Sequence, residues 1–485
     1  MRSLPAVCVS FVLGAAACHA PEPVSVDTPP GDDFVAPGPV HFIEDDLDFA
    51  LATARRDNKL LFVDAWAPWC HTCLSMRDEV LGRPELSGFA RDYVFLAIDT
   101  DRPTAASFLE RYRLRAWPTF FVIEPSSRAV LAMHGGALSL EELSRMLKRA
   151  RLSDAADVEP GQAELLQAHD AFGERRTLDA ARLYEDAATK LPDDRRTEAL
   201  LGAIRSLYEA KDHARCVEVG GAHLRAIKGA AAPSDFVFYL KECATALAEG
   251  PERDAALALV KRRLEELVDA PPAGATVDDR ADTIGLYAEV LKGEGNAPGA
   301  RAMEEKRLAL LVAAASAAST PEEVQTYDYA RMNALLALGR GEEALAMFEE
   351  RTKQLPKSYE AQARKGSTLV ALGRHKEALE PLSKAIELSY GPRRLRYLAQ
   401  KAKAQQAILD RAGALATLEE EVLGWRGLPA SQRDEARLAD AEKRLAEARA
   451  PKLAGELSCR RRSRTWTASS PTSPGSPVRP ARRPR

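Results

Sequence analysis

Two cysteines separated by two residues, Cys70 and Cys73, are the side chains of this 485-residue chain best suited to chemistry. An apolar strand is predicted over Leu60–Trp66, and after Pro68 a helix is predicted to open at Cys70. Unpaired N–H groups and the macrodipole at a helix N-terminus favour an anion, so we expect the pKa of the Cys70 thiol to fall below about 8.5. A protonated His71 would lower it further. Cys73 lies one helical turn deeper, where it can attack a mixed disulfide formed by Cys70, and the spacing predicts reversible thiol–disulfide exchange.

Two other uses of a cysteine pair stay open, a metal site and a static disulfide. Structural zinc normally needs two such pairs, and the sequence holds no second Cys-x-x-Cys. A copper site favours nearby methionines, of which only Met76 is close in sequence. Delivery of a metal by Cys70, Cys73 and His71 is therefore the weaker hypothesis. We expect no bound metal and no cofactor other than the redox-active disulfide itself.

The elements around the pair predict a mixed sheet with helices on both faces. Helices are predicted over 44–56, 70–81, 105–112 and 140–149, and strands over 60–66, 93–99, 119–123 and 129–133.

Three separated segments resemble the thioredoxin family. Residues 63–73 read Val-Asp-Ala-Trp-Ala-Pro-Trp-Cys-His-Thr-Cys, similar to the family's active-site segment. Trp117-Pro118-Thr119, followed by apolar residues, resembles its cis-proline loop, and residues 136–139 resemble its last turn before the terminal helix. The resemblance implies an α/β thioredoxin-like domain over residues 41–150.

The resemblance also implies roles for single residues. Cys70 would be the attacking nucleophile and Cys73 the resolving thiol. Asp64 would be a buried carboxylate that assists proton transfer at Cys73, although a strand-end aspartate bonded to backbone is the alternative. Pro118, in the cis form, would pack against the cysteines, and Trp69 would flank them.

Two departures from the family concern the tuning of the pair. The residues between the cysteines are His71 and Thr72, which set the balance between thiolate and disulfide but do not reveal whether the domain reduces or oxidises its clients. The strand at 93–98 is uncharged, so a lysine that some members place there has no counterpart. The whole combination looks closer to periplasmic exchange domains.

Residues 161–450 are predicted to form an all-α repeat solenoid. Ala337-Leu338-Gly339-Arg340 recurs as Ala371-Leu372-Gly373-Arg374, an offset of 34 residues. This period resembles the tetratricopeptide repeat, so we expect roughly six to eight helix pairs, irregular between about 225 and 325, that bind a protein or peptide. Cys216 and Cys243 are expected to be two buried free thiols, with a disulfide as the alternative.

The N-terminal segment predicts export. Residues 1–18 form a signal peptide ending in Ala-Ala-Ala-Cys, which resembles a lipobox with Cys18 as the lipidated residue, whereas ordinary cleavage near Ala20 is the alternative. A Pro-rich tether follows over residues 19–40. No later stretch is apolar enough to span a membrane, so a lipid at Cys18 is the one membrane contact expected. The tail 458–485 is basic and predicted to be disordered. Because the tail has one aromatic residue, Trp466, and the chain is expected to be exported, we expect no nucleic-acid partner.

These features predict an exported, periplasmic and lipid-anchored thiol–disulfide oxidoreductase. Its clients would be proteins with thiols or disulfides, positioned by the helical repeats, and it would exchange electrons with a membrane redox partner. The alternative is a non-catalytic scaffold lipoprotein whose repeats bind a partner and whose thioredoxin-like domain is a docking module.

Overall fold

The computed structural model describes residues 40–152 and 160–450. The expected signal peptide with Cys18, the tether up to residue 39 and the tail 458–485 lie outside the described residues. Among the helices of the described ranges, none combines the length and the apolar character needed to cross a membrane.

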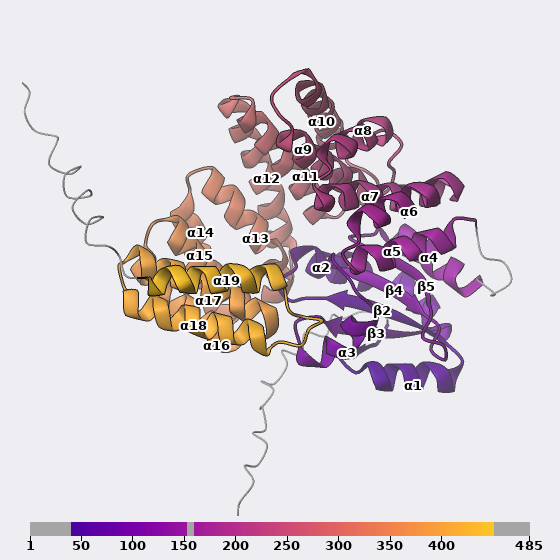
Figure 1. Ribbon diagram of the computed structural model, residues 1–485, viewed down its shortest axis with the longest axis horizontal. Helices are drawn as coiled ribbons and strands as arrows, with labels where there is room; N and C mark the ends of the chain where they lie inside the picture. The colour runs from indigo at the N-terminus through magenta and orange to yellow at the C-terminus, as the bar shows by residue number, and fades with distance from the viewer. Residues whose placement is uncertain (1–39, 153–159, 451–485) are drawn as a thin grey trace, which may run out of the picture. The chain divides into compact units, whose positions relative to one another are not determined.

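The first part of the chain folds around a five-stranded mixed sheet with the order β1-β3-β2-β4-β5 (Figure 1). Strands β1, β3 and β2 are parallel, and β4 and β5 run antiparallel to their neighbours. The strands are β1 (Phe42–Glu44), β2 (Leu60–Trp66), β3 (Tyr93–Asp99), β4 (Thr119–Ile123) and β5 (Val130–Gly135). This arrangement confirms the predicted α/β fold class.

The sheet separates two hydrophobic cores, because side chains alternate across each strand. On one face, Val63 packs with Leu51 and Phe108 from helices before and after it. On the other face, Phe62 packs with Leu143 of the closing helix. The covering elements are α1 (Leu47–Asp57), α2 (His71–Met76) with a π-helical turn at Arg77–Leu81, 3₁₀ segments at Pro84–Arg91 and Pro103–Ala105, α3 (Ala106–Arg111) and α4 (Leu140–Leu152).

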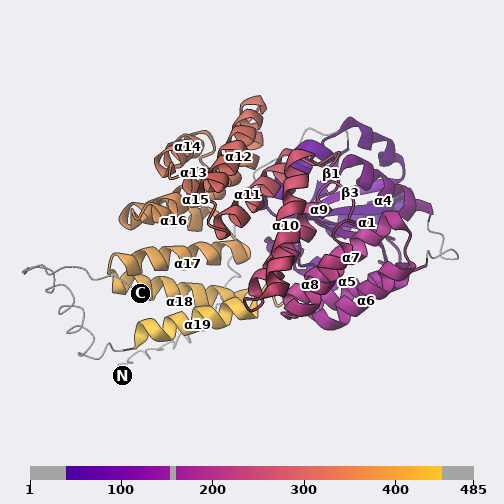
Figure 2. The same ribbon diagram turned by 90° about the horizontal axis from the view of Figure 1, so that it is seen from above.

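The second part of the chain is a run of helices that pack in sequence order, as Figures 1 and 2 show for α13 to α19. They are α5 (Gln162–Gly173), α6 (Thr177–Lys190), α7 (Asp193–Ala210), α8 (His213–His223), α9 (Ala232–Ala246), α10 (Pro251–Asp269), α11 (Val277–Gly293), α12 (Ala297–Ala317), α13 (Pro321–Ala337), α14 (Gly341–Gln354), α15 (Tyr359–Ala371), α16 (His375–Leu388), α17 (Gly391–Ala407), α18 (Arg411–Gly427) and α19 (Glu435–Arg449). Within the described residues this is seven successive pairs and one final helix, within the predicted range.

The 34-residue period recurs in three dimensions. Gly339 and Gly373 follow α13 and α15 with the same φ of +74°, a conformation that glycine adopts without steric cost. Helices α14 to α16 have 13 or 14 residues, whereas α10 to α12 have 17 to 21. The longer helices explain why the sequence loses its period between 225 and 325.

The two cysteines of the repeat array form a disulfide, so the expectation of two free thiols is wrong. Cys216 on α8 and Cys243 on α9 are joined by an S–S bond of 2.00 Å with Cα atoms 6.1 Å apart, and both are fully buried. Packing of α8 against α9 brings the side chains together, which a separation of 27 residues in the sequence does not reveal.

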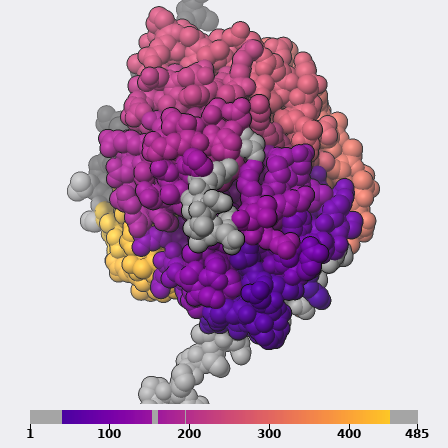
Figure 3. All heavy atoms as spheres, turned by 90° about the vertical axis from the view of Figure 1, so that its right-hand side faces the viewer, coloured from indigo at the N-terminus to yellow at the C-terminus, as the bar shows by residue number. Residues whose placement is uncertain are grey.

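The array packs against the α/β domain at several places. Helices α11 and α13 contact α2, and α5 contacts β5, where Gln162 donates to the Leu131 carbonyl at 3.2 Å. Gln432 donates to the carbonyls of Thr100 and Arg102 after β3, at 2.9 and 2.7 Å. Figure 3 shows one face on which atoms of the first repeat helices border those of the α/β domain.

Candidate active site

The cysteine pair lies at the junction between β2 and α2. Cys70 is the N-cap of α2, and its Sγ accepts a hydrogen bond of 3.0 Å from the backbone N–H of Cys73. The two sulfurs form a disulfide, and the residues are only 5% and 1% exposed. In the reduced form the same N–H and the helix N-terminus would stabilise a Cys70 thiolate.

Asp64 is buried in the middle of β2, opposite Ala97 and Phe120 of the neighbouring strands. Its Oδ2 accepts from Arg77 Nε at 3.3 Å, and its Oδ1 has no hydrogen-bond partner among the described residues. Burial raises the pKa of Asp64, and the charge of Arg77 partly offsets this. A buried carboxyl with a raised pKa and a free oxygen is suited to accept a proton.

Arg77 is a site residue that the sequence interpretation missed. It is 5% exposed, and its guanidinium lies 3.4 Å from the ring centroid of Trp66. A second carboxylate, Glu44, lies 3.9 Å away, and burial raises the pKa of Glu44 to about 7. Arg77 begins the π-helical turn that continues α2, four residues after Cys73.

Two tryptophans pack against the pair, and a cis proline follows the second of them. Trp69 and Trp117 pack against the cluster that contains both cysteines, with ring centroids 5.5 Å apart. Trp69 Nε1 donates to Asp101 Oδ2 at 2.8 Å. The Trp117–Pro118 peptide is cis, and Pro118 is buried.

The residues between the cysteines are held by the repeat array. His71 Nδ1 lies 2.8 Å from Asp278 Oδ2, and Thr72 Oγ1 donates to the same oxygen at 3.2 Å. Burial lowers the pKa of His71, but the charge and hydrogen bond of Asp278 outweigh it and raise the pKa to about 9. No motif near Asp278 in the sequence indicated this contact.

One group in the described ranges could hold a metal ion. Ligand atoms of His71, Asp278 and Asp282 lie within 4.8 Å of one another. Arg307 already donates to Asp282 at 3.2 Å, and His71 is bonded to Asp278. A cation would have to displace Arg307 from Asp282 and break the hydrogen bond between His71 and Asp278, so the geometry favours an ion-pair network.

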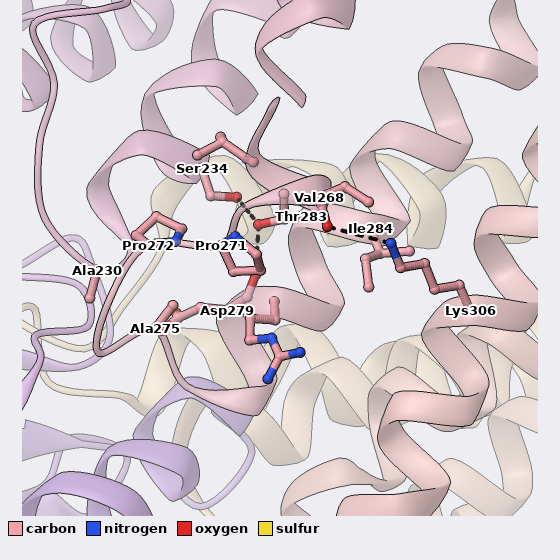
Figure 4. A pocket seen from close by; sticks show the side chains of 12 residues that line it. Ala230, Ser234, Val268, Pro271, Pro272, Ala275, Asp279, Thr283, Ile284 and Lys306 are labelled. Atoms are coloured by element: carbon pink, nitrogen blue, oxygen red, sulfur yellow. Dashed lines mark hydrogen bonds between the residues drawn. The ribbon is translucent and has the colours of Figure 1, made fainter. Parts of the chain in front are cut away.

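Two cavities differ in their relation to the cysteines. One cavity lies within the array, where Ser234 and Thr283 hydrogen-bond each other and Lys306 donates to the Val268 carbonyl (Figure 4). A second cavity lies beside the pair. Its walls come from both parts of the chain and include Trp69, His71, Tyr329, Phe348 and Arg364.

Known proteins match the first part of the chain. A family model described as a thioredoxin-like domain matches residues 47–151. Thioredoxin-1 of Drosophila yakuba is 34% identical over 94 residues, which is 19% of this chain and 78% of that protein. Thioredoxin-1 of Drosophila melanogaster is 35% identical over 94 residues, again 19% of this chain and 78% of that protein. The chain belongs to the thioredoxin family.

The thioredoxin domain is thus joined to a helical array, and solved repeat proteins are similar to the chain at low identity. A tetratricopeptide-repeat protein of Thermus thermophilus is 24% identical with a TM-score of 0.29, covering 43% of this chain and 99% of that one. Another, from Parabacteroides merdae, is 10% identical with a TM-score of 0.36, covering 58% and 97%.

Proposed function

We propose that the chain is an exported thiol–disulfide oxidoreductase that exchanges disulfides with client proteins. The observation that carries the proposal is the position of Cys70. Its sulfur caps α2, accepts the Cys73 N–H at 3.0 Å and is bonded to Cys73. A dithiol at a helix N-terminus is the arrangement that lowers a thiol pKa and supports exchange.

The reaction moves two electrons between the pair and a client. In the reducing direction, the Cys70 thiolate attacks one sulfur of a client disulfide, forms a mixed disulfide and releases the client's other sulfur as a thiolate. Cys73 gives its proton to Asp64 and attacks the Cys70 sulfur, which forms the Cys70–Cys73 disulfide and frees the second client thiol. A dithiol donor must then reduce the pair again. The oxidising direction is the reverse and needs a disulfide acceptor.

Export agrees with the second disulfide. Cys216 and Cys243 form a buried cross-link in the array, and stable disulfides are typical of proteins that fold in an oxidising compartment. We propose a periplasmic location with a lipid anchor at Cys18, clients positioned by the repeats, and a membrane redox partner that exchanges electrons with the pair.

The test is differential alkylation of the reduced full-length chain together with turnover of a disulfide-bonded protein. Cys70 should be alkylated faster than Cys73 at pH 7. Replacing Cys73 by serine should trap a mixed disulfide on Cys70, and replacing Cys70 should abolish turnover. Equal inertness of both thiols would rule the function out.

A second candidate function is a scaffold in which the thioredoxin domain serves as a docking module. The observation that favours it is the low exposure of Cys70, 5%, beside a cavity partly lined by the array. If Cys70→Ser leaves partner binding unchanged and wild-type protein shows no turnover, this reading replaces the first.

A further inference from the structure

Asp278, the second residue of α11, contacts both residues that separate the cysteines. It accepts from Thr72 Oγ1 at 3.2 Å and lies 2.8 Å from His71 Nδ1. The Asp278 side chain is fully buried, and that of His71 is 24% exposed. One carboxylate of the repeat array therefore fixes the dipeptide that tunes the redox pair.

The start of α11 is fixed independently of this contact. Thr276 and Asp279 form a reciprocal capping box. The backbone N–H of Val277 donates to the Glu79 carboxylate, 3.3 Å away on the helical turn that continues α2. Asp278 therefore lies in the first turn of a helix whose dipole stabilises its negative charge.

Other charged groups near His71 have their own partners. Asp282, also on α11, is paired with Arg307 of α12 at 3.2 Å. The Tyr329 ring of α13 lies 5.2 Å from the His71 ring, and Arg364 of α15 lies 4.2 Å from the Tyr329 centroid. Among these groups Asp278 alone is hydrogen-bonded to the imidazole.

We propose that Asp278 is a positioning residue of the redox site, which binds and orients His71 and Thr72, so that the array sets the reactivity of Cys70. This inference rests on the proposed exchange function. His71 is the first residue of α2, so its positive charge adds to the helix N-terminus in stabilising the Cys70 thiolate. Burial lowers the pKa of His71, and the charge and hydrogen bond of Asp278 are the main factors that oppose it.

The test follows the His71 ring by NMR titration in the full-length chain, in EDTA, with His71→Ala for assignment. Wild-type His71 should titrate near 9, and Asp278→Asn should bring its pKa to or below the ordinary 6.5. The control Asp282→Asn removes a charge one turn further along α11 and should shift the His71 pKa less. Alkylation of Cys70 at pH 7 should slow in Asp278→Asn, by about tenfold for each unit by which the thiol pKa rises above 7.

A double-mutant cycle separates tuning from structural damage. Asp278→Asn should slow Cys70 alkylation less in the His71→Ala background than in the wild type, because in that background only the Thr72 contact is lost. The inference is overturned if Asp278→Asn slows alkylation equally in the wild-type and His71→Ala backgrounds. It is also overturned if wild-type His71 titrates at or below 6.5, a measurement made on the wild-type chain with His71→Ala used only to assign the signal. An inert Cys70 with a His71 pKa near 9 would instead refute the exchange function and leave the Asp278–His71 contact standing.

Discussion

Arg77 and Asp64 form a buried ion pair, with Nε 3.3 Å from Oδ2 and side chains 5% and 2% exposed. Asp64 lies on β2, the central strand, and Arg77 lies on the π-helical turn that continues α2, so the ion pair links these two elements. Breaking a buried pair by removing one partner is strongly destabilising, since the other charge stays unpaired.

Replacing Arg77 by methionine should therefore lower the free energy of unfolding by about 3–5 kcal/mol at pH 8. The loss should shrink at pH 5, because the pKa of Asp64 is already raised by burial and without Arg77 the carboxyl takes a proton as pH falls. Denaturant unfolding at both pH values measures this. Arg83→Met, at an exposed arginine, is the matched control, and an equal loss at both pH values would contradict the explanation.

The melting temperature should fall steadily as pH rises from 5 to 9. Burial raises the pKa of Asp101 to about 7 and that of Asp99 to about 6. Their folded-state pKa exceeds the unfolded value, so the folded state holds extra protons that are lost as pH rises through 6 to 7. Protonated His71 contributes to the free energy of unfolding. This contribution is complete below the ordinary pKa of 6.5 and is lost as pH rises through the folded-state pKa of about 9.

Thermal melts in buffers of constant ionic strength test this prediction. Asp101→Asn should flatten the lower part of the profile and His71→Ala the upper part. A maximum of stability near pH 8 would show that these groups do not control it.

Removing the array disulfide should destabilise the protein without changing the redox pair. The double variant Cys216→Ala/Cys243→Ala should lose about 3.5 kcal/mol, because the cross-link closes a loop of 27 residues in the unfolded chain. The reduction potential of Cys70–Cys73 should stay the same. The control Cys70→Ala/Cys73→Ala removes a loop of 3 residues and should cost less, so equal losses would argue against the loop-closure explanation.

Gly391 sets how closely α17 approaches the loop after β3. Its φ is +54°, and an added Cβ would clash with the Asp101 carbonyl. Gly391→Ala should cost about 1–3 kcal/mol and speed amide hydrogen exchange over residues 99–106. Gly427→Ala, where a Cβ meets open space at the end of α18, is the control and should leave exchange in that loop unchanged.

Local sequence patterns accounted for most of the fold. The predicted strands at 60–66, 93–99 and 119–123 match β2, β3 and β4 residue for residue, because each is a nearly continuous apolar run buried on both faces. Strand β1 has three residues, too few to show a period, and the 3₁₀ segment at Pro84–Arg91 was not predicted.

Only some residues of the candidate site could be predicted from the sequence. Cys70, Cys73 and Pro118 carry family motifs, so their positions could be predicted. Arg77 could have been found, since it follows Cys73 by one turn of the same helix. Asp278 could not, because its contact with His71 joins residues 207 apart through tertiary packing of α11 on α2.

The packing of α11 and α13 on α2 also affects how any client affinity must be interpreted. Both helices are tethered to the surface they cover, so their local concentration is far above that of a free competitor. A client that needs the space beside Cys70 binds only chains in which that contact has opened, and its apparent dissociation constant is the intrinsic one divided by the open fraction. Two clients with the same intrinsic affinity for the redox site would therefore differ in apparent dissociation constant if they differ in how readily they displace the array.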